Sequence, residues 1–142
     1  MTSIHDEAVA FDTNVFIFAL RKDVNHPACE SLLFDKLGAL KIHIPLQILL
    51  ELQHNLTASE MRGVFLALAK AKVVTWDYTL APLELVRKWE QRGAKKGDAV
   101  VAAHLESANI RYFVSENRHF LAELLELPFV VLTSDKVTQQ LA

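Results

Sequence analysis

The chain has 142 residues, a length that suits one domain with one hydrophobic core, and 51% of its residues are hydrophobic. This composition excludes a disordered chain, and no apolar run reaches the roughly 20 residues of a membrane-spanning helix. The net charge of −2 and the pI of about 6.3 exclude nucleic-acid binding that rests on bulk positive charge.

The amino-terminal segment and the one cysteine indicate the cellular compartment. Residues 1–10 carry acidic groups and no long apolar run, so we expect no signal peptide. Cys29 is alone, so no internal disulfide can form, and we expect a small core residue in a reducing environment. These features predict a cytoplasmic protein. The mean hydropathy of +0.19 is high for this size and hints at oligomerisation.

Short apolar runs alternate with helical patterns along the chain. In chain order we expect a strand over Ala8–Phe11, helices over Asn14–Leu20 and His26–Leu37, a strand over Lys41–Ile44, and helices over Pro45–Leu56 and Ala58–Ala71. A strand over Val73–Trp76, helices over Leu80–Arg92 and Gly97–Ala108, a strand over Tyr112–Val114, a helix over Asn117–Leu125 and a strand over Phe129–Leu132 follow. Thr57 or Ser59 is expected to cap the helix that begins at Ala58. This order predicts a single α/β domain over residues 1–142, with helices on both faces of a parallel sheet.

Ligands of such sheets bind beyond the carboxyl ends of the strands. Asp12 directly follows the first strand, where it serves either as a helix cap or as a site residue. Ser115, Glu116 and Asn117 follow the fourth strand, where an ordinary capped loop is the other interpretation. Both groups therefore belong to the same predicted edge of the sheet.

Two further acids lie on predicted helices. Asp98 opens an apolar helix, so its carboxylate is expected to be partly buried, although a cap role would explain it alone. Glu51 shares a polar stripe with Gln47 and His54, which fits either a solvated face or a polar cleft. We expect His104, on the same helix as Asp98, to be a hydrogen-bonded core histidine.

Four short stretches together resemble the PIN-domain family, and most closely the toxin ribonucleases of bacterial toxin–antitoxin pairs. They are the strand and Asp-Thr-Asn run of residues 9–14, Glu51 in a leucine-rich helix, the Gly-Asp-Ala run of residues 97–103, and residues 113–120. They occur in the family's order and cover most of the chain. The resemblance implies a three-layer α/β/α sandwich around a central parallel sheet of about five strands.

The resemblance also implies roles for individual residues. Asp12, Glu51 and Asp98 would be the acidic metal ligands, with Asn117 in the fourth position. Ser115 would be the hydroxyl beside Asn117, and Asn14 would be a supporting amide. The chain departs from an all-acid pattern at Asn117, which removes a negative charge and makes a second tightly held ion less certain. Glu116 is the neighbouring acid that could replace it, but neighbours on a strand point to opposite faces.

A cluster of three carboxylates needs a cation. Each pair at ~4 Å costs on the order of 4 kcal/mol at an effective dielectric constant of ~20. Carboxylate and water oxygens suit Mg²⁺ or Mn²⁺, and no His or Cys spacing along the chain resembles a zinc site. A water activated by such an ion would attack the phosphorus of RNA. The cations nearest the motifs, which are candidates for holding the RNA backbone, are Arg21, Lys22, Lys95, Lys96 and Arg118.

Three other functions compete with a ribonuclease. A phosphatase of the haloacid-dehalogenase type needs a second acid where Asn14 stands. A receiver-type phospho-acceptor domain would use Asp77, Ser115 and Lys136, but it leaves Glu51 and Asp98 without a role. A PIN-like RNA- or protein-binding module without catalysis is compatible with Asn117. For a toxin, the resemblance further implies a homodimer and an antitoxin whose tail blocks the pocket.

Overall fold

The computed structural model describes residues 3–142. A central sheet contains five parallel strands in the order β3-β2-β1-β4-β5. The strands are β1 Ala8–Phe11, β2 Lys41–Pro45, β3 Val73–Asp77, β4 Tyr112–Val114 and β5 Val130–Leu132. The predicted α/β class, the parallel sheet and all the predicted strands are confirmed.

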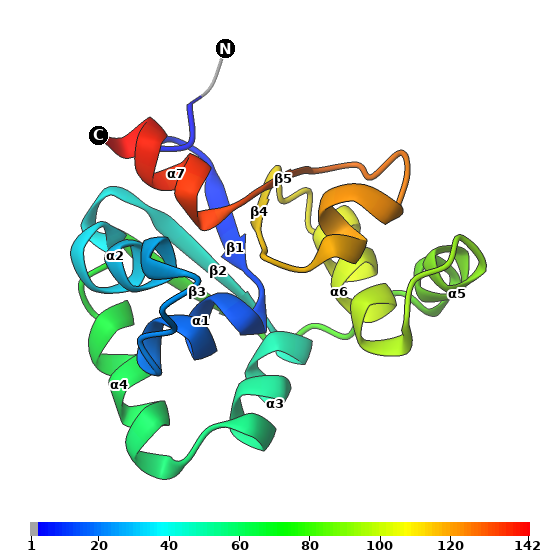
Figure 1. Cartoon of the computed structure of the whole chain (residues 1–142). Coiled ribbons are helices and arrows are strands. Elements are labelled where there is room, and N and C mark those ends of the chain that lie inside the picture. The colour runs from blue at the N-terminus through cyan, green and yellow to red at the C-terminus, as the bar shows by residue number, and fades with distance from the viewer. Residues whose placement is uncertain (1–2) are drawn as a thin grey trace.

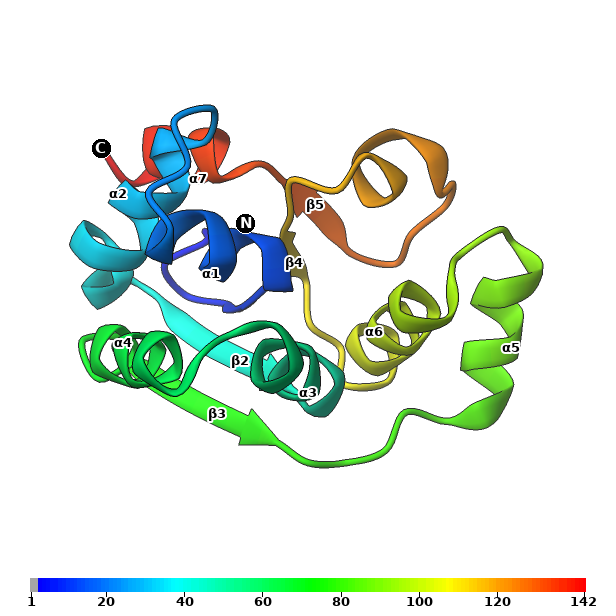
Figure 2. The same cartoon turned by 60° about the horizontal axis from the view of Figure 1, so that its bottom comes forward.

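Helices cover both faces of this sheet (Figures 1 and 2). They are α1 Thr13–Leu20, α2 Pro27–Asp35, η1 Leu37–Ala39, α3 Leu46–Asn55, α4 Ala58–Leu68, α5 Leu83–Gln91, α6 Lys96–Ser107, η2 His119–Glu123 and α7 Ser134–Leu141. Helices α1 to α4 and α7 lie on one face, where α2 packs against both α1 and α7. Helices α5, α6 and η2 lie on the other face, as right-handed crossovers require. No helix in this described part is long and apolar enough to cross a membrane.

The path of the chain through the sheet reverses beside β1. The chain first runs outward from β1 through β2 to β3, and then returns through α5 and α6 to β4, on the other side of β1. Phe11 of β1 pairs with Val114 of β4, so the residues that follow them emerge side by side. The Asp12 N–H donates to the Val114 carbonyl at 2.8 Å. In doubly wound sheets this is the point where ligands bind.

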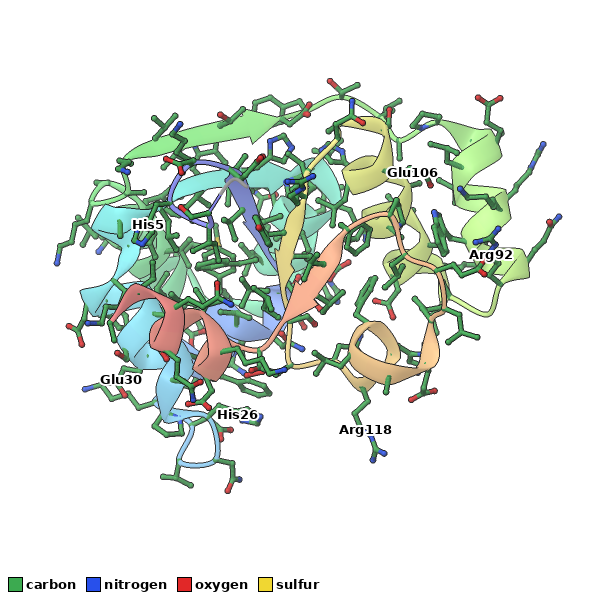
Figure 3. All side chains as sticks on the ribbon, turned by 90° about the horizontal axis from the view of Figure 1, so that it is seen from above. His5, His26, Glu30, Arg92, Glu106 and Arg118 are labelled. Carbon is green, nitrogen blue, oxygen red and sulfur yellow. The ribbon has the colours of Figure 1, made fainter. Side chains whose placement is uncertain are left out.

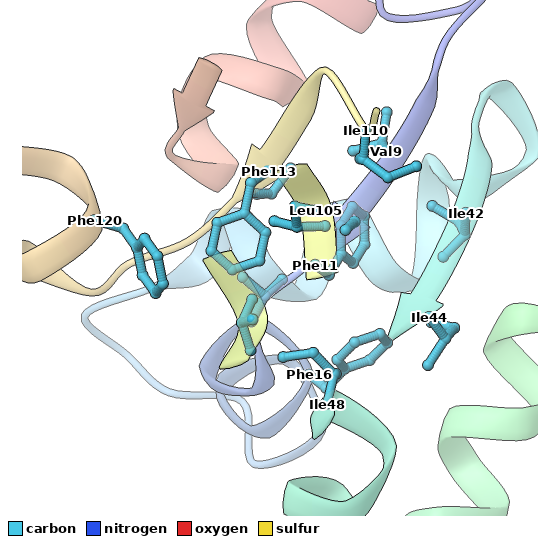
Figure 4. Packing of buried hydrophobic residues seen from close by; sticks show 14 of the residues in the cluster. Val9, Phe11, Phe16, Ile42, Ile44, Ile48, Leu105, Ile110, Phe113 and Phe120 are labelled. Atoms are coloured by element: carbon cyan, nitrogen blue, oxygen red, sulfur yellow. The ribbon is translucent and has the colours of Figure 1, made fainter. Parts of the chain in front are cut away.

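Aromatic packing fixes the two strands that meet at this point. The ring of Phe113 on β4 lies 4.9 Å from that of Phe120 and 5.8 Å from that of Phe129, both at edge-to-face angles. Phe11 on β1 contacts Phe16 on the opposite face of the sheet, and both are fully buried (Figure 4). Each buried side chain of this size stabilises the fold by about 2–3 kcal/mol. The carboxyl ends of β1 and β4 therefore have a firm apolar base.

Helix boundaries agree with the prediction where a cap is visible in the sequence. The side chain of Thr57 accepts from the Glu60 N–H, and that of Glu60 accepts from the Thr57 N–H, which completes the predicted capping box. Helix α5 begins at Leu83 instead of Leu80. Pro82 explains the difference, because a proline disfavours helical backbone at the residue before it.

Two carboxyl-terminal segments differ from the prediction. The helix expected over Asn117–Leu125 is a short π-type turn, η2, because Asn117 stays in the loop and its side chain accepts from the His119 N–H at 3.0 Å. Helix α7 was not predicted. Thr133, a residue type that is preferred as a helix cap, precedes it, and its side chain accepts from the Lys136 N–H.

Candidate active site

Asp12 lies at the end of β1 and is 6% exposed. Its Oδ1 accepts from the Thr13 N–H at 2.8 Å, and its Oδ2 accepts from the Ser115 hydroxyl at 2.7 Å. The same carboxylate therefore caps α1 and lies at the point where the sheet reverses. The cap role of Asp12 is observed, and the position of its carboxylate at the sheet reversal is compatible with the other interpretation, a site residue.

Glu51 reaches this place from α3. Its Oε1 accepts from the Thr13 hydroxyl and its Oε2 from the Gln47 side-chain amide, each at 2.8 Å. Thr13 directly follows Asp12, so one residue of α1 positions both acids. Glu51 is half-buried, and its bond to Thr13 turns this part of the polar stripe of α3 toward α1.

Asp98 approaches from the first turn of α6. Its Oδ2 accepts from the Asn117 side-chain amide at 3.3 Å. Gly97 lies so close to Glu51 that a Cβ at position 97 would be 3.2 Å from Glu51 Oε2. The start of α6, the loop after β4 and the face of α3 thus meet beside Asp12, and the fold brings Asp12, Glu51, Asp98 and Asn117 into one place.

The loop after β4 is held by its own polar groups. The Ser115 hydroxyl, which donates to Asp12, accepts from the Asn117 N–H at 3.0 Å. The side-chain oxygen of Asn14 accepts from the Glu116 N–H at 3.4 Å. Glu116 itself points away from the acids, since its carboxylate accepts from the Ser134 N–H at 3.4 Å. The structure therefore places Asn14 and Ser115 as supports and leaves Glu116 outside the acidic cluster.

Burial and mutual repulsion change the protonation of these acids. Burial raises the pKa of Asp12 to about 6, the charges of Asp98 and Glu51 add to the increase, and the bonds from Ser115 and Thr13 oppose it. The pKa of Asp98 is also raised, first by burial and then by Glu51, while the Asn117 amide opposes the change. The cluster is therefore costly to ionise without a cation.

The residues present fit a hard divalent cation. Within residues 3–142, no ion pair involves Asp12, Glu51 or Asp98, and Lys95 and His119 offset the charge of Asp98 only in part. The donors of the three acids are oxygens, which Mg²⁺ and Mn²⁺ prefer. Among the described residues, the three carboxylates do not all offer an oxygen within 4.8 Å of one another, so an ion held directly by one or two of them would reach the rest through water, as Mg²⁺ does.

Three cations lie near the acidic cluster. Lys95 and Lys96 are exposed at the start of α6, and Lys95 lowers the pKa of Asp98. Arg118 is exposed beside the loop after β4 and extends away from the body of the protein (Figure 3). Arg21 is instead paired with Glu60, with 3.0 Å between Arg21 Nε and Glu60 Oε2.

The residues of a receiver-type site are not brought together. Asp77 ends β3, and two strands separate it from β4 and Ser115. Ser115 is bonded to Asp12, and Lys136 is exposed on α7. The phospho-acceptor alternative therefore has no common pocket.

Asp77 belongs instead to a second polar cluster with His43 and His104. Both histidines are buried, as expected for His104, but the meeting of the three side chains was not predicted. They come from β2, the end of β3 and the middle of α6, so no short spacing links them. The one visible signal was His43 between two isoleucines of a predicted strand.

The fold and the acids that meet at the sheet reversal define an α/β protein with a cluster of carboxylates at the carboxyl edge of its parallel sheet. The sequence pattern of the PIN domain matches residues 9–124, and the chain belongs to the PIN-domain family. PIN domains are generally nucleases. No curated protein matches the chain.

Two solved structures share this fold. One is VapBC2 from Rickettsia felis, bound to a DNA fragment from its promoter; the TM-score is 0.59 and the identity 19%, over 89% of this chain and 98% of that one. The other is PAE2754 from Pyrobaculum aerophilum, with a TM-score of 0.57 and 16% identity, over 99% of this chain and 98% of that one. At these identities the likeness concerns the fold.

Proposed function

We propose that this chain is a divalent-metal-dependent ribonuclease. The observation that carries the proposal is the convergence of Asp12, Glu51 and Asp98, from three separate elements, without a cation of the chain between them. These acids would hold Mg²⁺ or Mn²⁺. When bound, such an ion supplies an activated water and stabilises the charge that develops on the phosphate and the leaving oxygen.

The surrounding side chains prepare the acids for this role. Thr13 and Ser115 hold the Asp12 carboxylate in one orientation, and Thr13 also fixes Glu51. Asn117 holds Asp98 through its amide, while its own oxygen is fixed by the His119 N–H. Preorganisation of this kind removes the cost of arranging the ligands when substrate binds.

RNA would be held by local positive charge. Lys95, Lys96 and Arg118 are exposed on the segments that carry Asp98 and Asn117, so they would contact backbone phosphates beside the scissile bond. This arrangement suits a chain with a net charge of −2, because the positive charge is needed only beside the site.

We further propose that the chain is the toxin of a toxin–antitoxin pair, acts in the cytoplasm and forms a homodimer. The R. felis structure of the same fold is a VapBC complex, which supports an antitoxin partner. The exposed side chains of Leu80, Leu83 and Leu125 support a protein partner or a second copy. Burial raises the pKa of the Cys29 thiol to about 11, so Cys29 is an unreactive core residue, which suits a reducing compartment.

An RNA-cleavage assay tests the ribonuclease proposal. Metal-free protein is incubated with structured and unstructured RNA in Mg²⁺, Mn²⁺ or EDTA, beside Asp12→Asn and the exposed control Asp35→Asn. We expect cleavage by wild type and by the control only with added metal, and none by Asp12→Asn. Cleavage in EDTA, or an Asp12→Asn variant as fast as wild type, contradicts the proposal.

A catalytically impaired binding module is the second candidate, and Asn117 favours it because it removes one negative charge from the site. This module would bind RNA in EDTA as well as in Mg²⁺ and would cleave it in neither. An Asn117→Asp variant that gains cleavage where wild type has none would identify the missing charge as the cause.

A further inference from the structure

A trio of ligand-type side chains lies apart from the acidic cluster. His43 Nε2 is 2.9 Å from His104 Nε2, and Asp77 Oδ2 lies 3.4 Å from the first and 3.3 Å from the second. His43 and His104 are 6% and 5% exposed, and Asp77 is partly exposed at the end of β3. We propose that these three side chains form a second metal site, for a zinc-type transition ion held by two imidazole nitrogens and one carboxylate oxygen.

The spacing of the three atoms fits such an ion. Zinc binds nitrogen and oxygen ligands at about 2.0–2.1 Å, so neighbouring ligands of a tetrahedral site lie about 3.3 Å apart. The observed triangle has sides of 2.9, 3.3 and 3.4 Å. An ion about 0.9 Å above its plane would lie at the ordinary bonding distance from all three atoms. The three distances therefore match one face of a zinc-sized tetrahedron. Each imidazole would turn by a few tens of degrees to direct its lone pair at the ion, because the two Nε2 atoms face each other, with ring centroids 5.2 Å apart.

Hydrogen bonding alone leaves this trio incomplete. The Nε2 atoms of His43 and His104 lie 2.9 Å apart, which leaves room for only one hydrogen between them. That hydrogen would have to serve both the other Nε2 and Asp77 Oδ2. A cation at the centre would satisfy all three atoms together.

Outer hydrogen bonds orient two of the proposed ligands. The ring of His104 bonds to the backbone of Thr79, and Asp77 Oδ1 accepts from the Thr79 N–H at 2.9 Å. Metal-binding histidines and carboxylates in proteins are usually fixed by such bonds to a carbonyl or an N–H. The residue that follows β3 by two positions thus holds both ligands toward their common point.

The site also has room for a fourth ligand. Asp77 and His104 line a cavity of about 210 Å³, and the Ser107 hydroxyl and Thr79 lie on its wall. A water or a small anion could reach the ion from this side, as in zinc sites with three protein ligands. The nitrogen ligands distinguish this site from the all-oxygen acidic cluster, since imidazole selects zinc-type ions and carboxylate with water selects Mg²⁺.

Binding of Zn²⁺ and Co²⁺ to metal-free protein tests the proposal. Titration calorimetry with Zn²⁺ and visible absorption with Co²⁺ are done in an Asp12→Asn, Asp98→Asn background, so that the acidic cluster contributes no binding. We expect one equivalent of Zn²⁺, tetrahedral Co²⁺ bands that Zn²⁺ abolishes, and a rise in Tm with Zn²⁺. His104→Gln and His43→Asn should each weaken binding by at least about 100-fold.

Matched variants keep the result decisive. His54→Gln removes an exposed histidine and should bind Zn²⁺ like its parent. If the buried histidine variants do not fold, Asp77→Asn, which changes a partly exposed group, carries the test. The proposal is overturned if the parent binds no stoichiometric Zn²⁺, or if Asp77→Asn and His54→Gln bind it equally well. The RNA-cleavage outcome does not bear on this result, because the two sites share no ligand.

Discussion

Helix α6 carries one partly buried carboxylate near each end, Asp98 and Glu106, and their surroundings shift the two pKa values in opposite directions. Asp98 at its start is bonded to a neutral amide and repelled by Glu51, and its pKa is raised by burial and by that repulsion. Glu106 near its end accepts from Lys88 Nζ at 2.7 Å and from Trp89 Nε1 at 2.9 Å. Burial alone would raise the pKa of Glu106, but the bonds from Lys88 and Trp89 lower it. Figure 3 shows Glu106 at the interface with α5.

The two acids differ in whether a cation of the chain forms an ion pair with the carboxylate. Glu106 joins α6 to α5, and its charge is offset within the chain. Asp98 is held by one bond at 3.3 Å, and the negative charge of Glu51 raises its pKa although Lys95 and His119 act in the opposite direction. An unpaired buried charge costs stability, so its presence at a site of converging acids indicates a role in binding a cation.

Asp98→Asn and Glu106→Gln form the sharpest test of this contrast. Asp98→Asn should lower metal-dependent RNA cleavage by about 100- to 1000-fold, the loss typical of removing a group that stabilises the transition state. Glu106→Gln should cleave within a few-fold of wild type. The measurement is the initial rate of cleavage in Mg²⁺ for proteins whose circular dichroism matches wild type. An equal loss of cleavage rate in both variants would contradict the different roles assigned to Asp98 and Glu106.

Asp12 should make the metal-free protein less stable as pH rises. Its pKa is about 6 in the fold and near 3.8 when the chain unfolds, so the folded state holds the extra proton between these values. Stability from this group is present at low pH and is lost as pH rises through 6. The two pKa values correspond to about 3 kcal/mol.

Urea unfolding in EDTA from pH 4 to 7, which spans most of the interval between the two pKa values, measures this contribution as the difference between wild type and Asp12→Asn. The comparison is needed because burial lowers the pKa of His43 and His104, which titrate in the opposite sense. The free energy of unfolding of Asp12→Asn should increase relative to that of wild type as pH rises, and saturating Mg²⁺ should reduce the difference between the two proteins. A constant difference across this range would show that Asp12 is ionised throughout.

The sequence predicted the sheet and the polar residues at the carboxyl ends of β1 and β4, because both depend on local pattern. The apolar runs of β1 and β4 and the polar residues that follow them are contiguous in the chain, and the parallel order then fixes their common edge. The state of Glu51 was not predictable, because periodicity gives the same stripe for a solvated face and for a cleft. The hydroxyl of Thr13 settles it by bonding to Glu51 across 38 positions of sequence.

Two features that were not predicted from the sequence depend on contacts between residues far apart in the chain or on loop structure. Asn117 stays out of a helix because its side chain bonds to the next turn and to Asp98. The trio of His43, Asp77 and His104 exists only because β2, β3 and α6 pack together. No spacing along one element encodes either feature.

Glu106→Gln should destabilise the fold by about 1 kcal/mol while leaving the active site intact. The change removes the charge that accepts from Lys88, and the value is modest because both side chains are partly exposed. Asp98→Asn should be neutral or slightly stabilising in EDTA, because it removes repulsion from Glu51. Thermal unfolding of both variants in EDTA checks the opposite signs. A stabilised Glu106→Gln variant would contradict the structural role of that ion pair.

Gly97→Ala should have the smallest effect and should separate stability from activity. Its Cβ would lie 3.2 Å from Glu51 Oε2 and 3.6 Å from Gln47 Nε2, so the Glu51 carboxylate must shift by a few tenths of an ångström. Alanine favours helix over glycine by up to about 1 kcal/mol, so Tm should hold or rise slightly. Cleavage should fall several-fold and need more Mg²⁺, whereas the control Gly38→Ala, whose Cβ meets only an ordinary contact, should keep its rate. An unchanged Mg²⁺ requirement in Gly97→Ala would mean that the position of Glu51 does not matter to the bound ion.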